Sequence, residues 1–204
     1  PCKVKFEGSF TYDGNASNQP KYALGGFLRS PEGAVVEING GTFLNGTYFY
    51  VYVRGGKQGS KVNTKLNLVN TVFKDTNSGT GKGDPIYPQN TLGYSPAYVI
   101  VHDKVEVVTY DFYAEYSKPV SVGVYAPIAI WMSFYGVAST AGEPSLYMRG
   151  TTKLKGLGRG SQDYDGAGYM NNGLGVVDFY GVCDSLIVDE VLAEGCHSEV
   201  IRSK

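Results

Sequence analysis

The stretch that most clearly decides the fold class is residues 47–54, TYFYVYVR. Successive side chains of an extended strand point to opposite faces, so its three tyrosines share one face and Phe49, Val51 and Val53 share the other. Large apolar side chains on both faces predict a strand in the middle of a sheet.

Similar β-branched and aromatic segments recur along the chain, separated by Gly, Pro, Asn and Ser, and this pattern predicts further strands. Together the expected strands are 3–12, 23–29, 34–38, 47–54, 61–73, 97–102, 105–116, 124–135, 146–155 and 174–182. Only residues 185–194, SLIVDEVLAE, have the pattern of a short helix, with Ser185 as its N-cap and Gly195 as its C-terminal stop.

A chain of strands with almost no helix favours an antiparallel fold, because parallel strands need long crossover connections. We therefore expect an all-β chain: an antiparallel β-sandwich, immunoglobulin-like or jelly-roll, in one domain over residues 1–204. No repeat of fixed period is evident, which disfavours a propeller or solenoid. The residues expected in the core are Phe49, Val51, Val53, Tyr110, Phe112, Trp131 and Phe134.

The composition argues against two kinds of function, general nucleic-acid binding and membrane insertion. The 204 residues include 28 Gly and 17 Tyr, and 18 Lys plus Arg balance 19 Asp plus Glu to a net charge of −1. This balance predicts no general attraction to nucleic acid. The longest apolar stretch is shorter than the ~18 residues of a membrane helix, so no membrane insertion is expected.

The three cysteines, Cys2, Cys183 and Cys196, form no C-x-x-C pair. The composition resembles that of extracellular β proteins, which favours an exported chain with one disulfide. The first residues have no hydrophobic signal core, so we expect a mature or trimmed product. Cys183 and Cys196 would close a short loop and are the first choice; Cys2 paired with either one, or three free thiols in a cytosolic protein, are the alternatives.

Motifs for catalysis are scarce. His102 and His197 are the only histidines, and no nucleophile elbow, zinc motif or phosphate loop occurs. Asp111, Glu115, Asp163 and Asp165 could supply the paired carboxylates of a glycan hydrolase, a less favoured alternative. Oxygen ligands at Asp75 and Asn77, or at Asp163 and Asp165, leave calcium binding open, although such pairs are more often plain turns. No cofactor is expected.

Two long loops, 74–96 and 156–175, are the expected location of function. Tyrosines, amides and carboxylates on Gly-rich loops suit sugar or protein recognition, because the ring stacks while the polar groups form hydrogen bonds. The predicted ligand-binding residues are Arg159, Gln162, Asp163, Tyr164, Asp165, Tyr169, Asn171 and Asn172.

Residues 104–137, KVEVVTYDFYAEYSKPVSVGVYAPIAIWMSFYGV, are similar to the receptor-binding domains at the tips of bacterial chaperone–usher pili, in which a long aromatic strand, a Gly-x-Tyr turn and a second strand recur. The resemblance implies a monomeric, non-enzymatic adhesin that is secreted to the bacterial surface. It also implies binding of host glycan or protein at the pilus tip, with a following pilin domain joining other pilus subunits. A viral or phage spike module, which would be oligomeric, is the alternative.

Overall fold

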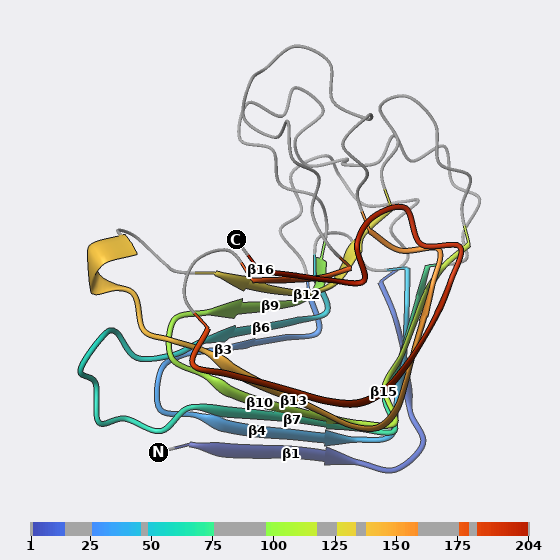
Figure 1. The fold of residues 1–204 in the computed structure, drawn as a ribbon. Coiled ribbons are helices and arrows are strands. Elements are labelled where there is room, and N and C mark those ends of the chain that lie inside the picture. The colour runs from blue at the N-terminus through green and yellow to red at the C-terminus, as the bar shows by residue number, and fades with distance from the viewer. Residues whose placement is uncertain are drawn as a thin grey trace, which may run out of the picture.

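The computed structural model describes residues 2–14, 26–45, 49–75, 97–117, 126–133, 138–158, 176–179 and 183–203. Strands dominate these residues, and the chain winds repeatedly through the same sequence of strand positions (Figure 1). We call one such circuit a rung. The described residues make six rungs, which are stacked along one axis.

Three strand positions recur in successive rungs. The first position is occupied by β1 (Lys3–Glu7), β4 (Val35–Asn39), β7 (Lys65–Val69), β10 (Glu106–Tyr110), and the first parts of β13 (Ser145–Lys155) and β15 (Ser185–Glu194). The second is occupied by β2 (Thr11–Asp13), β5 (Thr42–Leu44), β8 (Val72–Asp75), β11 (Tyr113–Tyr116), and the remainder of β13 and β15. The third is occupied by β3 (Leu28–Ser30), β6 (Val51–Arg54), β9 (Ala97–His102), β12 (Ile128–Ser133), β14 (Val177–Phe179) and β16 (Ile201–Ser203). One 3₁₀ turn, Ala138–Thr140, precedes β13.

Every pairing between these strands is parallel and joins neighbouring rungs. The first and second positions form a bent ten-stranded sheet, sheet A, and the third position forms a six-stranded sheet, sheet B. The molecule is thus a parallel β-solenoid, and the predicted antiparallel β-sandwich is wrong. The crossover that each parallel strand requires is supplied by the other strands of its rung, so no helix is needed.

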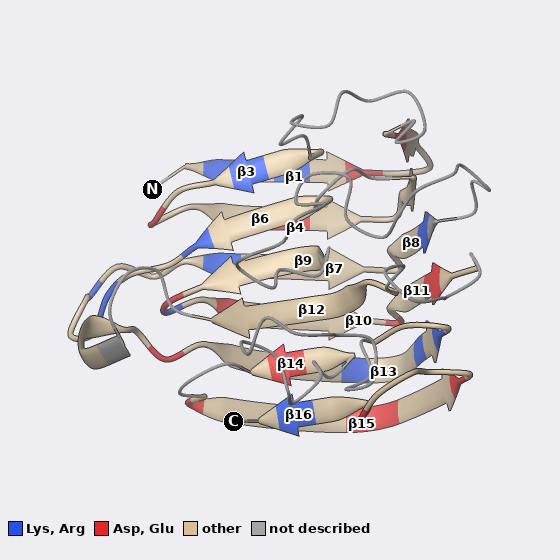
Figure 2. Ribbon diagram, turned by 90° about the horizontal axis from the view of Figure 1, so that it is seen from above, with Lys and Arg blue, Asp and Glu red and all other residues tan. Residues whose placement is uncertain are grey.

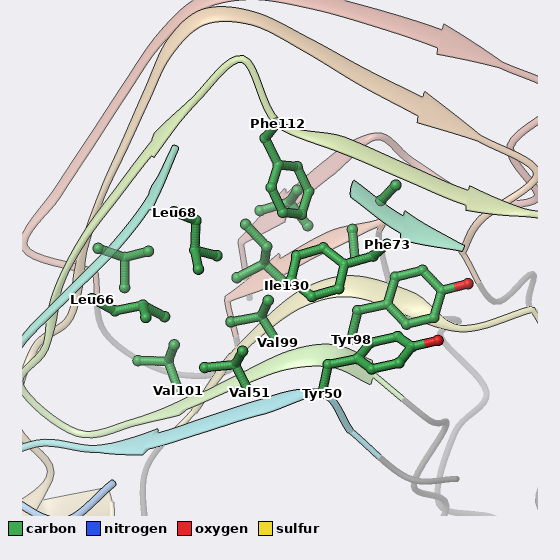
Figure 3. Packing of buried hydrophobic residues seen from close by; sticks show 14 of the residues in the cluster. Tyr50, Val51, Leu66, Leu68, Phe73, Tyr98, Val99, Val101, Phe112 and Ile130 are labelled. Atoms are coloured by element: carbon green, nitrogen blue, oxygen red, sulfur yellow. The ribbon is translucent and has the colours of Figure 1, made fainter. Parts of the chain in front are cut away.

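The core lies between the sheets and is built from columns of in-register side chains. First-position strands alternate outward and inward residues, and one inward column contains Val36, Leu66, Val107 and Leu146, all fully buried. Inward residues of the other positions complete the interior, where aliphatic and aromatic side chains from distant parts of the sequence are packed together (Figure 3).

The corner between the first two positions repeats in five rungs. There a residue with positive φ follows the first-position strand: Gly8, Gly40, Asn70, Asp111 and Gly150. Its N–H donates to a carbonyl of the next rung in four of these corners, as from Gly40 to Val69 at 2.8 Å and from Asn70 to Tyr110 at 2.8 Å. Gly and Asn tolerate this left-handed conformation, which explains their recurrence at the corner.

Several local predictions are corrected by the structure. Residues 185–194 form strand β15 rather than a helix, because they pair with β13 at nine register positions. Phe49, Val51, Val53, Phe112 and Trp131 are buried, as predicted. Tyr110 is 48% exposed because it lies on the outward side of β10, and Phe134 is outside the described residues.

All three cysteines are free thiols, so the expected Cys183–Cys196 disulfide is not formed. The extended strand β15 lies between Cys183 and Cys196, whereas a disulfide requires Cα atoms within about 7 Å. Partial burial raises the pKa of the Cys183 thiol. No helix among the described residues is long and apolar enough to cross a membrane.

Candidate functional site

The outer face of sheet B gathers polar and aromatic residues from all six of its strands. Val51, Val99, Ile130 and Val177 point into the core, so the residue after each of them points outward. Neighbouring strands are about 4.8 Å apart, so in-register pairing lines these outward residues up as a row. The row is Arg29, Tyr52, Ile100, Trp131, Asp178 and Arg202.

The middle of this face is apolar. Tyr52, Ile100 and Trp131 are buried and belong, together with Phe49, Ala97 and Ile128, to a hydrophobic cluster separate from the main core. Sheet B therefore has apolar side chains on both faces, as the sequence predicted for residues 47–54. The predicted facing is wrong at two residues: Tyr50 packs in the main core with Val51 and Val53, and Phe49 packs with Tyr52. Strict alternation does not extend to them because β6 begins only at Val51. This second cluster is the floor of the candidate site.

His102 is the last residue of β9 and lies beside this floor. Its ring centroid is 5.3 Å from that of Tyr52 and 6.0 Å from that of Trp131. Burial lowers the pKa of His102 to about 4; Asp103 opposes this change, whereas Arg54, Lys57 and Arg29 add to it. The imidazole is therefore neutral near pH 7.

Asp103 is the fully buried residue that follows His102. Its backbone has a φ of 63°, and its N–H donates to the carbonyl of Ser133 at 2.9 Å. The Lys57 ammonium lies 3.3 Å from Asp103 Oδ1, which places the flexible cation next to the end of β9. A buried carboxylate with a cationic partner holds this corner in one arrangement.

Basic side chains surround the floor. Arg29 is exposed and its guanidinium carbon lies 4.7 Å from the centre of the Tyr52 ring. Figure 2 shows basic residues on β3, at the end of β6 and on β16, and an acidic residue on β14. Among the residues that the structure describes here, the acidic side chains Asp103 and Asp178 are both buried. In a chain with a net charge of −1, this face consequently presents exposed and half-exposed cations.

All eight ligand-binding residues predicted from the sequence, from Arg159 to Asn172, lie outside the described residues. The described ends of the two predicted loops can still be compared. Loop 74–96 begins at the end of β8 and loop 156–175 begins after β13; Lys74 and Lys155 are aligned in register through Glu115. Both loops therefore leave the same corner of the solenoid, two rungs or about 10 Å apart.

The carboxylates that could have served a glycan hydrolase do not form a facing pair in the described part of the chain. Asp111 occupies a corner before β11 and accepts a hydrogen bond from the Thr151 N–H at 2.9 Å. Glu115 lies four residues further along, on β11, where it is hydrogen-bonded to Tyr113 and Ser117 rather than to Asp111. A 2.6 Å hydrogen bond from the Tyr113 hydroxyl lowers the pKa of Glu115, which is the wrong direction for a general acid. Asp163 and Asp165 are not described.

The predicted calcium positions Asn77, Asp163 and Asp165 likewise lie outside the described residues. Among the described residues, no group of three or more His, Cys, Asp or Glu side chains is arranged to hold a metal ion.

Arg29, Arg54 and His102 were missed by reasoning from the sequence, which found no functional motif around either histidine. Their signal was present in the outward positions of third-position strands, which include Arg, Tyr, His, Trp and Asp, whereas the inward positions are mostly apolar. Only the parallel register shows that these positions share one face. No protein-family model, curated protein or solved structure matches this chain.

Proposed function

We propose that this chain is a non-enzymatic adhesin domain, displayed on a cell surface, that binds acidic glycans on the outer face of sheet B. The observation that supports this most is the grouping of Arg29, Arg54 and Lys57 around the neutral His102, above an aromatic floor. Lys57 is already paired with Asp103 at 3.3 Å, so the arginines rather than Lys57 are the proposed anion-binding groups.

The chemistry of these residues suits a sugar that carries carboxylate or sulfate groups. Guanidinium groups form two parallel hydrogen bonds with such anions, and these charge-assisted bonds are stronger than neutral ones. A neutral imidazole adds one donor and one acceptor for hydroxyl groups. Tyr52, Ile100 and Trp131 are themselves buried, so the proposed contacts are made by the exposed and half-exposed arginines beside this cluster.

The loops 74–96 and 156–175 support the same location of binding. They leave the corner where sheet B begins, and loops on a rigid scaffold are a common location for recognition residues. Asp163, Tyr164, Asp165 and Asn172 remain the proposed loop contributors to specificity.

The test is a glycan array that contains acidic glycans and their neutral counterparts, followed by titration of the best ligand. Arg29→Ala should weaken binding about tenfold, the loss of one charge-assisted contact, while leaving stability within about 0.5 kcal/mol because the side chain is exposed. Affinity should also fall as salt is raised.

The matched control is Arg149→Ala, which removes a half-exposed arginine, paired with Asp189, from sheet A, away from the proposed face. It should bind like the parent. Equal binding of acidic and neutral glycans, or an equal loss in both arginine variants, would refute the proposed site. Alanine variants of Asp163, Tyr164, Asp165 and Asn172, measured on the same ligand, test the contribution of the loop separately.

A further inference from the structure

The two ends of the solenoid expose unpaired strands with apolar side chains. Among the described residues, β15 pairs only with β13 and β1 pairs only with β4. On β15, Leu186 is 38% exposed and Ile187 is 40% exposed. Leu186 is notable because it occupies the inward column of Val36, Leu66, Val107 and Leu146. It occupies a core position on which none of the described rungs is stacked.

At the opposite end of the solenoid, β1 carries the first residues of the same inward columns. Val4 continues the column of Leu186, and Phe6 continues the column of Val188. Val4 and Phe6 are only half-buried in β1, and Phe6 packs against Phe10 and Phe27 at this end. Val4 placed on Leu186, and Phe6 on Val188, would extend both columns with side chains of the kind they already contain.

The pattern of backbone hydrogen bonds between rungs could also continue from the last rung of one copy to the first rung of another. Between neighbouring rungs, Glu106 N–H donates to Thr64, Ser145 N–H donates to Val105, and Gly156 N–H donates to Glu194. The same pattern carried across the ends would join Lys3 N–H of one copy to the Asp184 carbonyl of another. Gly195, which has a φ of 58°, would donate to the Asp13 carbonyl.

Charge distinguishes head-to-tail stacking from symmetric pairing. Two β15 strands related by a two-fold axis would run antiparallel and bring the central Asp189 and Glu190 of both copies together. Two β1 strands would similarly oppose their central Lys5 residues. Like charges directly opposite each other are destabilising in sheets.

Head-to-tail stacking instead brings the β1 lysines over the acidic β15. Lys3 already reaches Glu37, two residues beyond its register partner Val35, at 3.1 Å. The same diagonal would bring Lys5 to Asp189 of the adjoining copy. Glu7 and Asp189 would also be level, but each has a cation within 3.0 Å, Lys5 and Arg149 respectively.

We infer that copies of this chain stack end to end, with β15 and β16 of one copy against β1, β2 and β3 of the next, so that the solenoid continues across the contact. Such a head-to-tail contact does not close on itself, and further copies add at either end. This inference is independent of glycan binding, which uses the outer face of sheet B.

The experiment is sedimentation velocity of the full chain over a range of concentrations. Leu186→Lys blocks the C-terminal end and Val4→Lys blocks the N-terminal end, and Tyr110→Lys, on an exposed side position of β10, is the matched control for added charge. The parent and the Tyr110 variant should grow in mass with concentration beyond two copies. Each end variant should remain monomeric at concentrations where the parent associates.

An equimolar mixture of the two end variants gives the decisive result. One compatible end remains on each variant, so the mixture should form a heterodimer and nothing larger. Circular dichroism and melting of each variant alone show that it is folded. A monomeric parent at every concentration would overturn the inference, and so would a Val4→Lys variant that dimerises alone or a mixture that stays monomeric.

Discussion

At the scale of the residue, the lowered pKa of His102 gives a prediction that can be tested. Burial beside Tyr52 and Trp131 disfavours the imidazolium, and the arginines and lysine nearby disfavour it further. The folded pKa of about 4 lies below the ordinary value of 6.5. The unfolded chain therefore takes up a proton before the folded chain does as pH falls.

The contribution of neutral His102 to stability should be complete above about pH 6.5 and should be lost as pH falls to about 4. The loss should approach about 3 kcal/mol, the free energy equivalent of the pKa difference. Urea unfolding of the parent and of His102→Gln between pH 7 and pH 4 measures it, because carboxylates titrate in both proteins and cancel in the comparison. An identical pH dependence in the two proteins would contradict the buried, neutral imidazole.

A second residue-scale prediction concerns hydroxyl groups in the core. The Thr109 hydroxyl is buried in an inward column between Leu68 and Met148 and has no hydrogen-bond partner among the described residues. Thr109→Val replaces it with a methyl group of similar shape and should raise the free energy of unfolding by about 1 kcal/mol. Thr42→Val, at a half-exposed outward position, should change it little. Destabilisation by Thr109→Val, measured by urea unfolding, would show that the hydroxyl is satisfied.

At the scale of the element, the corners between first- and second-position strands decide whether rungs can stack closely. Gly40 has a φ of 89°, and a Cβ atom there would lie 2.5 Å from the Gly8 carbonyl oxygen of the preceding rung. Gly59 has a φ of 76°, but a Cβ atom there would have no neighbour within 4 Å. Comparing alanine substitutions at these two glycines therefore separates the cost of the left-handed backbone from the cost of the steric clash.

Gly59→Ala should cost about 1 kcal/mol from the left-handed backbone alone, and Gly40→Ala should cost about 3 kcal/mol or more because the clash is added. Thermal or urea unfolding of both variants gives the comparison. Equal losses would mean that the two rungs do not approach each other closely at Gly8 and Gly40.

Strand β15 shows where reasoning from sequence alone fails for an element. SLIVDEVLAE contains good helix formers with apolar residues at a helical spacing, and these local preferences predict a helix. Pairing with β13 along nine positions outweighs them, and tertiary context commonly overrides propensity in this way. By contrast, 97–102 and 146–155 were predicted within one residue, because their β-branched and aromatic runs have no competing interpretation.

At the scale of the whole molecule, most strand segments were predictable, but their direction of pairing was not. The corners that divide 3–12, 61–73 and 105–116 into two strands each were also missed. Alternation between two faces is the same in parallel and antiparallel sheets. The repeat that would have revealed the solenoid was hidden by connections of unequal length: only Asn45–Tyr50 separates β5 from β6, whereas residues 76–96 separate β8 from β9. The candidate site was missed for the same reason, since Arg29, Tyr52 and Trp131 become neighbours only once the parallel register is known.

The parallel stacking of rungs is tested most directly by nuclear Overhauser effects between methyl groups. Valine- and leucine-labelled protein should show contacts from Val36 to Leu66, from Leu66 to Val107 and from Val107 to Leu146, which join strands roughly 30 to 40 residues apart in one column. Absence of this series, with contacts instead between strands that follow one another in sequence as hairpins, would contradict the parallel solenoid.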